Sequence, residues 1–300
     1  MIPAVGVRIG WRDLPRRVHD AVAEILGAPV REAQSQSGGF SPGSADRVVT
    51  TSGGRAFVKA VSPDQNRVSV DMARIEARVA AALPAATPAP ALLGTYDDGH
   101  WVVLVFEDVD GRHPRTPWVE AELDAAVRGL TELARTLTPC PLPDLPPASE
   151  RLATEFSGWS RIAANPPADL EPWLFPRLDE LVTRSTRALE SLTGDTLVHC
   201  DVRADNMLYT AAGDVVFVDW PWACVGPAWF DMSQLALNVL VYGGDGDVLL
   251  PPQGVDVVIG FVGYFLDRSR DEPPPSLPTV RAFQRAQADA LLPWMRARLG

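Results

Sequence analysis

Three oxygen-bearing side chains at fixed spacing near residue 200 constrain the fold more than any other feature of this sequence. Asp201 lies two residues after His199, and Asn206 lies five residues after Asp201. A short apolar run over residues 215–218 then ends at Asp219. The stretch between Asn206 and Asp219 has the pattern of two short strands joined by a tight turn. The sequence therefore predicts a strand–turn–strand unit between these polar side chains.

The second informative feature is a lysine. Lys59 is the only lysine among the 27 Lys and Arg residues of the chain. It lies in a predicted strand, 55–61, that follows the Gly-rich segment 37–43. A lysine ammonium is a compact point charge, whereas arginine presents a planar fork, and the two are not interchangeable. The next predicted helix carries two carboxylates that could pair with this ammonium, Asp71 and Glu76.

Hydrophobic periodicity predicts an α+β fold with two lobes. In the first 107 residues the predicted strands are 30–36, 45–51, 55–61, 89–96 and 101–106, and the predicted helices are 13–27 and 64–83. Beyond them the predicted helices are 118–137, 149–164, 176–192, 228–242, 253–268 and 277–299, with short strands at 196–199, 206–210 and 215–219. We therefore expect a lobe with a five-stranded antiparallel sheet at 1–107, a larger mainly helical lobe at 108–300, and a hinge at 105–113.

Composition excludes several classes of partner. The net charge of −11 and the pI of about 4.8 argue against non-specific nucleic-acid binding, which requires a basic footprint. The sequence has neither a secretory leader nor an apolar window long enough to span a bilayer, so we expect a cytoplasmic protein without membrane contact. The three cysteines are an odd number without metal-ligand spacing, which fits reduced thiols. Monomer and homodimer both stay open.

The spacing around Asp201 is that of a kinase catalytic loop followed by its metal-binding Asp. In that interpretation Asp201 is the base that accepts the proton of a substrate hydroxyl. Asn206 and Asp219 supply the oxygen ligands that Mg²⁺ prefers, and Lys59 contacts the nucleotide phosphates. Taken singly, Asp201 could be an ordinary loop carboxylate and Asn206 a turn residue. Their joint occurrence with Asp219 favours phosphoryl transfer.

Other residues near this motif are expected to be structural. His199 is expected to brace the loop through backbone hydrogen bonds, and Cys200 is not expected to act as a nucleophile. Asp231 is expected to cap the helix 228–242 at its N-terminus and to brace the catalytic loop. The aromatic residues that follow the motif are expected to pack in the core: Trp220, Trp222, Trp229 and Phe230.

These segments resemble the aminoglycoside phosphotransferase family, which has a protein-kinase-like fold. The resemblance implies ATP, with GTP not excluded, and Mg²⁺ as cofactors. It favours Glu76 over Asp71 as the partner of Lys59, and it places the adenine edge against the Glu107 carbonyl and the Val109 N–H. It also implies a nucleotide loop made of Ser37, Gly38, Gly39, Phe40 and Ser41.

The sequence departs from the family pattern at three positions near the motif. Cys200 stands where the family usually has Gly, Asp205 where it often has Gly, and Pro221 where an acidic residue is common. None of these changes removes a predicted ligand of nucleotide or metal. They leave the identity of the acceptor open.

The sequence thus predicts an ATP- and Mg²⁺-dependent O-phosphotransferase that acts on a hydroxyl of a small molecule. The first candidate acceptor is an antibiotic, aminoglycoside-like or another natural product, in resistance or self-resistance. The alternative is a metabolic acceptor such as an amino alcohol, sugar or nucleoside, and a catalytically silent nucleotide-binding module is a third possibility. Six acidic residues mildly favour a cationic acceptor: Asp245, Asp247, Asp256, Asp267, Asp271 and Glu272.

Overall fold

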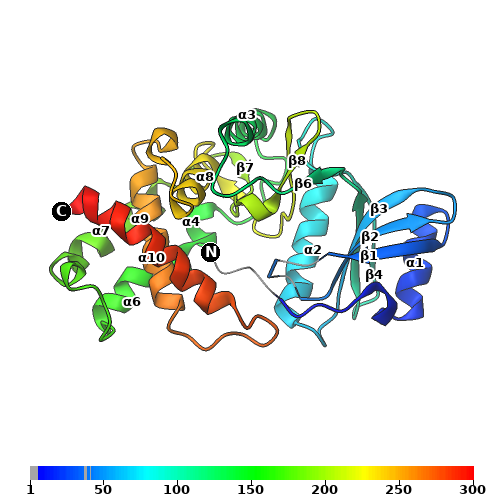
Figure 1. The fold of residues 1–300 in the computed structure, drawn as a ribbon, viewed down its shortest axis with the longest axis horizontal. Helices are drawn as coiled ribbons and strands as arrows, with labels where there is room; N and C mark the ends of the chain where they lie inside the picture. The colour runs from blue at the N-terminus through cyan, green and yellow to red at the C-terminus, as the bar shows by residue number, and fades with distance from the viewer. Residues whose placement is uncertain (1–5, 37–38, 41) are drawn as a thin grey trace.

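The chain forms a sheet-containing N-terminal lobe and a larger helical lobe (Figure 1). The structure, a computed structural model, describes residues 6–36, 39–40 and 42–300. The predicted α+β class and the five-stranded antiparallel sheet are confirmed. The division into domains at residues 107 and 108 stays a prediction.

The N-terminal sheet positions Lys59 near its centre. Its strands run in the order β1-β2-β3-β5-β4, and each neighbouring pair is antiparallel. The strands are β1 (Val30–Ser35), β2 (Ser44–Thr50), β3 (Arg55–Val61), β4 (Leu92–Asp97) and β5 (Val102–Glu107). Lys59 on β3 lies opposite Ala45 of β2 and Leu104 of β5, so both neighbours fix its register.

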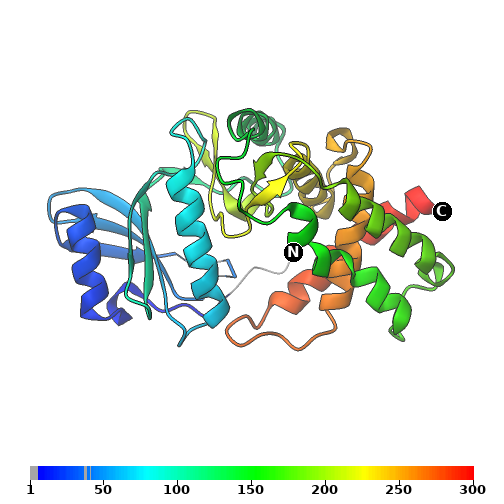
Figure 2. The same cartoon turned by 180° about the vertical axis from the view of Figure 1, so that it is seen from behind.

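Two helices cover opposite faces of this sheet (Figures 1 and 2). Helix α1 (Arg16–Leu26) packs its buried Val18 and Val22 against the face that contains Val58. Helix α2 (Arg67–Ala82) packs against the other face and lies between the sheet and the helical lobe. The side chain of Asn66 caps α2 by accepting a hydrogen bond from the Ser69 N–H at 3.0 Å.

The helical lobe is built around two apolar helices, α8 and α9. Its helices are α3 (Glu120–Thr136), α4 (Ala148–Arg151), α5 (Ala153–Phe156), α6 (Gly158–Ala164), α7 (Leu178–Ser191), α8 (Phe230–Val241), α9 (Gly254–Arg268) and α10 (Val280–Leu299). Most residues of α8 and α9 are buried, which fits helices that are covered on several sides. In the described part of the chain, no helix is both long enough and apolar enough to cross a membrane.

Short strands carry the motif residues between these helices. The three predicted strands are present as β7 (Thr196–Val198), β8 (Met207–Thr210) and β9 (Val215–Phe217). The structure adds β6 (Gly111–Arg112), which pairs with β8, and β10 (Cys224–Gly226), which pairs with β7. Strands of two or three residues carry too little periodicity to be predicted. Because β6 lies within the predicted hinge 105–113 and pairs with β8, part of this hinge belongs to the small sheet that carries the motif residues.

One predicted helix is wrong as a continuous element. The segment 149–164 forms three short helices, α4, α5 and α6, because the backbone at Leu152 and Ser157 departs from helical geometry with ψ of 7° and 3°. At Gly158 the chain approaches α9 so closely that a Cβ would lie 2.6 Å from the backbone of Gly263. The breaks let this segment follow the surface of α9. Local hydrophobic periodicity does not predict such breaks, because they depend on a contact with a distant segment.

The close approach at Gly158 yields a stability prediction. Gly158→Ala would force α6 away from α9, and we expect a loss of about 1–3 kcal/mol in the free energy of unfolding because the core would be overpacked. Gly10→Ala is the matched control, since an added Cβ there meets its nearest atom at 3.4 Å and the φ of −88° suits alanine. Urea unfolding of both variants measures the difference, and equal stability of the two would contradict the packing argument.

Candidate active site

The two lobes meet at an ion triad centred on Lys59. The Lys59 ammonium donates a hydrogen bond to Glu76 Oε1 at 2.7 Å and another to Asp219 Oδ1 at 2.7 Å. Glu76 comes from α2, and Asp219 follows β9 of the helical lobe. Asp71, the rival partner, instead lies 3.6 Å from Arg74. The structure therefore brings Lys59, Glu76 and Asp219 together from positions far apart in the sequence.

Charge coupling dominates the electrostatics of this triad. Burial by itself would lower the pKa of Lys59, but the charges of Asp219 and Glu76 outweigh burial and raise this pKa above its ordinary value. Burial raises the pKa of Glu76, and Lys59 opposes that shift. For Asp219 the balance is reversed: burial would raise the pKa, but the neighbouring ammonium of Lys59 lowers it. Lys59 is thus charged at neutral pH and holds an ionised Asp219.

Asp201 is held in place by two neighbours on its own loop. Asn206 donates its amide N–H groups to the Asp201 backbone carbonyl at 2.9 Å and to Asp201 Oδ2 at 2.8 Å. Arg203 donates to Asp201 Oδ1 at 3.1 Å and also binds Asp205 through two hydrogen bonds of 3.0 Å. Arg203 was missing from the predicted site residues, although it stands two residues after Asp201 inside the motif. Its guanidinium orients Asp201 and restrains Asp205.

Burial raises the pKa of Asp201 from its ordinary 3.8 to about 6, with a further upward contribution from the charges of Asp205 and Asp219 that Arg203 opposes. A carboxylate with a pKa near 6 is ionised at neutral pH and still has appreciable proton affinity. These are the properties of an effective general base.

Two residues near Asp201, one before it on its own loop and one after β9, have strained backbone conformations. Cys200 and Asp219 have φ values of 65° and 71°, in the left-handed region that favours glycine. A left-handed φ at position 200 is consistent with the glycine that the resemblance implies there. Each such residue costs on the order of 1 kcal/mol, so the surrounding structure must impose the conformation.

Helix α8 supplies that restraint through two side chains. The Asp231 carboxylate accepts hydrogen bonds from the backbone N–H groups of His199 at 2.8 Å and Cys200 at 3.0 Å. Gln234 accepts from the Val202 N–H at 3.0 Å and donates to the Cys200 carbonyl at 2.9 Å. Asp231 therefore braces the catalytic loop as expected, but it lies inside the first turn of α8 and is not its N-cap, which is Trp229.

His199 and Trp220 complete the support beneath the loop. His199 is fully buried and donates from Nε2 to the Val218 carbonyl at 2.9 Å, while its Nδ1 accepts from the Asp201 N–H at 3.3 Å. Its ring lies 4.6 Å from the ring of Trp220. Burial lowers the pKa of His199, so the imidazole is neutral and structural, as expected. Cys200 is also buried, and its thiol pKa is raised well above the ordinary value by a hydrogen bond with Cys224 and by burial.

The donor set near Asp219 fits a magnesium ion. Because Asn206 uses its amide nitrogen on Asp201, its amide oxygen is the atom directed elsewhere. Lys59 binds one oxygen of Asp219, and the second oxygen is then available to a cation. Within the described residues, no cluster of three or more His, Cys, Asp or Glu side chains forms a closed metal site. Two protein oxygens with remaining positions for phosphate and water match the habit of Mg²⁺ in nucleotide sites.

The predicted nucleotide loop is described in part. Ser37, Gly38 and Ser41 lie outside the described residues, whereas Gly39 and Phe40 lie within them. Gly39 has a φ of 77°. The Phe40 ring packs 5.1 Å from the ring of Phe283 on α10, and the Arg203 guanidinium lies 5.7 Å from that same ring. The loop is thus tied to the helical lobe next to Asp201 by an aromatic contact that the sequence did not reveal.

The predicted adenine-binding residues lie at the end of β5. Glu107 is the last residue of that strand and is opposite Ala56 of β3. The Val109 carbonyl accepts a hydrogen bond from Arg47 at 3.1 Å, and Arg47 also lies 3.3 Å from Asp108. These contacts hold the segment after β5 against the sheet. The roles of the Glu107 carbonyl and the Val109 N–H stay predictions.

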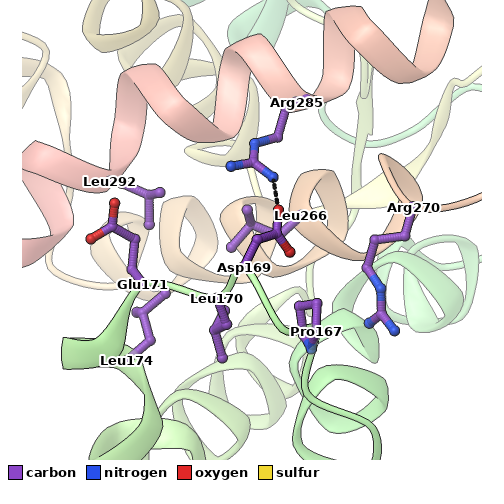
Figure 3. A pocket seen from close by; sticks show the side chains of 9 residues that line it. All are labelled: Pro167, Asp169, Leu170, Glu171, Leu174, Leu266, Arg270, Arg285 and Leu292. Atoms are coloured by element: carbon purple, nitrogen blue, oxygen red, sulfur yellow. Dashed lines mark hydrogen bonds and ion pairs between the residues drawn. The ribbon is translucent and has the colours of Figure 1, made fainter.

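Two hollows on the surface lie apart from these residues. Figure 3 shows the first, lined by the segment 167–174 and by side chains of α9 and α10, with Arg285 paired with Asp169 at 2.9 Å. Its volume of about 20 Å³ leaves room for about one water molecule. The second, of about 340 Å³, lies between α2 and strands β4 and β5. Neither is lined by a predicted site residue.

Comparison with known proteins gives a family match over most of the chain. The sequence pattern of the family described as the phosphotransferase enzyme family matches residues 39–253. This range includes Lys59, Glu76, Asp201, Asn206 and Asp219. No curated protein matches the sequence.

Solved structures share the fold at low sequence identity. A choline kinase from Streptococcus pneumoniae has a TM-score of 0.61 at 11% identity, covering 94% of this chain and 97% of its own. An aminoglycoside phosphotransferase from Alicyclobacillus acidocaldarius has a TM-score of 0.57 at 15% identity, covering 95% and 96%. A thermostable aminoglycoside phosphotransferase mutant in a ternary complex with ADP and hygromycin B has a TM-score of 0.57 at 14% identity, covering 92% and 98%. At such identities the similarity confirms the fold alone.

The raised pKa of Asp201 predicts how stability depends on pH. The protonated carboxyl is favoured by folding, so its contribution to stability is present below pH 4 and is lost as the pH rises to about 6. In Asp201→Asn this titration is removed. We therefore expect the stability of the variant, relative to the unmodified protein, to rise by about 2–3 kcal/mol between pH 4 and pH 6.

Urea unfolding at several pH values measures this difference. Asp214→Asn is the control, because Asp214 has an exposed carboxylate in the turn that joins β8 and β9. The difference in free energy of unfolding between this control and the unmodified protein should be constant between pH 4.5 and pH 6.5. If the difference in free energy of unfolding for Asp201→Asn were also constant over this pH range, the pKa of Asp201 in the folded protein would be ordinary.

Proposed function

Because the chain belongs to the phosphotransferase enzyme family, we propose that it transfers the γ-phosphate of ATP, with Mg²⁺, to a hydroxyl group of a small molecule. The observation that carries this proposal is that the fold joins two pairs of predicted site residues, since the Val218 N–H beside Asp219 donates to the Asn206 carbonyl at 3.0 Å. Lys59 touches Asp219 at 2.7 Å, and Asn206 touches Asp201 at 2.8 Å. Phosphoryl transfer needs these groups for positioning and charge neutralisation and needs little covalent chemistry from the protein.

In the proposed reaction Asp201 orients the acceptor and removes its proton. The bond between the γ-phosphorus and the β–γ bridging oxygen breaks, and a bond between that phosphorus and the acceptor oxygen forms. The hydroxyl proton passes to the Asp201 carboxylate, and ADP leaves. Lys59 binds the α- and β-phosphates, and Glu76 keeps the ammonium in place. Magnesium, held by Asn206 and Asp219, would neutralise charge on the β- and γ-phosphate oxygens.

The N-terminal lobe, residues 1–107, is the proposed nucleotide-binding domain, and residues 108–300 the catalytic and acceptor-binding domain. We assign the adenine edge to the Glu107 carbonyl and the Val109 N–H. The phosphates are assigned to the loop that contains Gly39 and Phe40. GTP is an alternative donor. The neighbouring complex that contains ADP supports nucleotide binding by this fold.

The acceptor is assigned to the region beside Asp201 in the helical lobe. Tyr264 of α9 lies there, and burial and the charge of Glu155 raise its pKa, with Asp201 a further contributor. Glu155 Oε2 is buried without a hydrogen-bond partner among the described residues. A buried carboxylate oxygen of this kind favours an acceptor that carries an amine or another donor group.

The six acidic residues after position 240 give weaker support for a cationic acceptor than the sequence indicated. Asp256 pairs with Arg184 at 3.1 Å and with Arg187 at 2.5 Å. Further arginine partners are found for Asp247, Asp267 and Asp271. These carboxylates stabilise helix contacts and are already neutralised. The argument for a cationic acceptor therefore depends on the groups next to Asp201.

The first candidate acceptor is a natural-product antibiotic, and the second is a metabolic amino alcohol. Structural neighbours include an aminoglycoside phosphotransferase and a choline kinase, which supports both candidates. A catalytically silent nucleotide-binding module is disfavoured by the joint presence of the triad and the Asp201 loop.

A panel of acceptors tests the proposal directly. Aminoglycosides, macrolides, choline, sugars and nucleosides are each incubated with Mg²⁺ and ATP, and phosphorus NMR detects the new phosphate ester. Asp201→Asn should lower turnover on the best acceptor by about 10²–10⁴-fold, because it removes the base, and it should leave nucleotide affinity nearly unchanged. Asp214→Asn, at an exposed position of the turn between β8 and β9, is the control. Normal turnover of Asp201→Asn would refute the base assignment, and nucleotide binding without turnover on any acceptor would favour the silent module.

The lysine requirement gives a second prediction. Lys59→Arg should reduce kcat/KM by at least about tenfold, because a planar guanidinium does not reproduce a point charge held by Glu76 and Asp219 at 2.7 Å. Arg31→Lys, on β1 of the same sheet, should change kcat/KM less than twofold, because its ion pair with Glu32 is exposed and such pairs have a small net worth. Steady-state kinetics compares the two, and equal effects would remove the special role of Lys59.

A further inference from the structure

A segment at the start of the described chain lies alongside the proposed nucleotide loop. The Gly6 N–H donates to the Gly39 carbonyl at 3.0 Å, and the Ile9 N–H donates to the Gly43 carbonyl at 3.1 Å. Between them, Arg8 and Gly43 form a parallel β-bridge. Four residues of this segment therefore follow the loop in a fixed register.

The same segment is also attached to the helical lobe. The Val7 N–H donates to the Ser276 carbonyl at 2.9 Å, in the loop that precedes α10. Ser276 Oγ in turn donates to the Gln65 carbonyl at 3.1 Å, just before α2. In Figure 1 this loop extends from α10 toward the N-terminal lobe. The backbone of Arg8 is thus positioned by contacts from both lobes.

The Arg8 side chain lies against the backbone of the nucleotide loop at Gly39. Arg8 Nη2 lies 3.1 Å from the position that a Cβ on Gly39 would occupy. The side chain is half-buried. Burial lowers the pKa of Arg8, and the charges of Asp219 and Asp46 oppose that shift. Arginine keeps its charge even when it is buried, so a guanidinium cation lies within electrostatic range of Asp219.

The two side-chain cations already assigned to the site are each shared by two carboxylates. Lys59 is shared by two carboxylates, Glu76 and Asp219, and Arg203 is shared by two more, Asp201 and Asp205. Each of these cations is thus outnumbered by its carboxylate partners. A triphosphate would add further negative charge, concentrated on the γ-phosphate.

We propose that Arg8 contacts the γ-phosphate of the bound nucleotide and stabilises the charge that develops on the transferring phosphoryl group. The guanidinium would reach the phosphates from the side of the nucleotide loop, where it lies next to Gly39. Its planar fork suits bidentate contact with two phosphate oxygens. Arg8 forms and breaks no covalent bond, because the transfer itself is between the β–γ bridging oxygen and the acceptor oxygen. This inference rests on the proposed phosphotransferase function.

Nucleotide binding tests the inference without any acceptor. Isothermal titration calorimetry compares a non-hydrolysable ATP analogue with ADP, both with Mg²⁺, on the unmodified protein and on Arg8→Ala. Loss of a charge-assisted contact to the γ-phosphate should weaken the ATP analogue by about tenfold or more. ADP lacks that phosphate, so its affinity should change less than twofold. The rate of a single turnover on the best acceptor should fall by about 10²-fold.

Two further variants keep the test decisive. Arg12→Ala is the matched control, since Arg12 is an exposed arginine in the same N-terminal segment, and it should change neither affinity. Arg8→Lys keeps the charge and should recover part of the preference for the ATP analogue. It also replaces Arg8→Ala in the comparison if thermal unfolding shows that the alanine variant is not folded.

The outcomes separate the two proposals. If the unmodified protein binds neither nucleotide, the phosphotransferase function fails and the Arg8 inference fails with it. If the unmodified protein binds both nucleotides and turns over, but Arg8→Ala behaves like Arg12→Ala, the Arg8 inference alone fails. Equal weakening of ADP and the ATP analogue would also overturn it, because the contact would then lie at the α- or β-phosphate.

Discussion

The pairing of one ammonium with two carboxylates from different lobes is the interaction on which this structure depends. Lys59 lies between Glu76 and Asp219, at 2.7 Å from each. Truncation of one partner would leave an uncompensated buried charge, which costs far more than the net worth of an intact pair. The sheet register that fixes Lys59, the capped helix that carries Glu76 and the turn that ends in Asp219 are therefore interdependent.

Backbone strain at two site residues is a second constraint, and hydrogen bonds from α8 offset it at Cys200. Cys200 and Asp219 both adopt left-handed backbone conformations without being glycine. Asp231 and Gln234 of α8 bind four backbone groups of the loop between them, which offsets the cost of holding Cys200 in that conformation. A loop over-determined in this way presents Asp201 in one orientation before any substrate binds. Such preorganisation is what positions a general base for in-line transfer.

The sequence predicted the parts of the site that follow from local pattern. Strand periodicity placed Lys59 on the sheet, and the spacing from Asp201 to Asp219 anticipated the strand–turn–strand unit that the structure contains. The contacts that pattern could not show all join distant segments. Gln234 reaches the loop from more than 30 residues away, Arg8 forms a β-bridge with Gly43, and the breaks in 149–164 lie where the chain approaches the backbone of α9. Local signals report the period of a segment but not its tertiary partner.

The charge of the chain shows why composition is a poor predictor of substrate. A net charge of −11 could attract a cation, yet acidic residues such as Asp256 and Asp267 bind arginines of neighbouring helices. A paired carboxylate contributes little field at a distance, because its partner cancels most of its charge. Selectivity must therefore come from groups whose hydrogen-bonding capacity is unused near the reacting atoms. Glu155 has a buried carboxylate oxygen without a hydrogen-bond partner among the described residues, and the net charge of the protein does not reveal it.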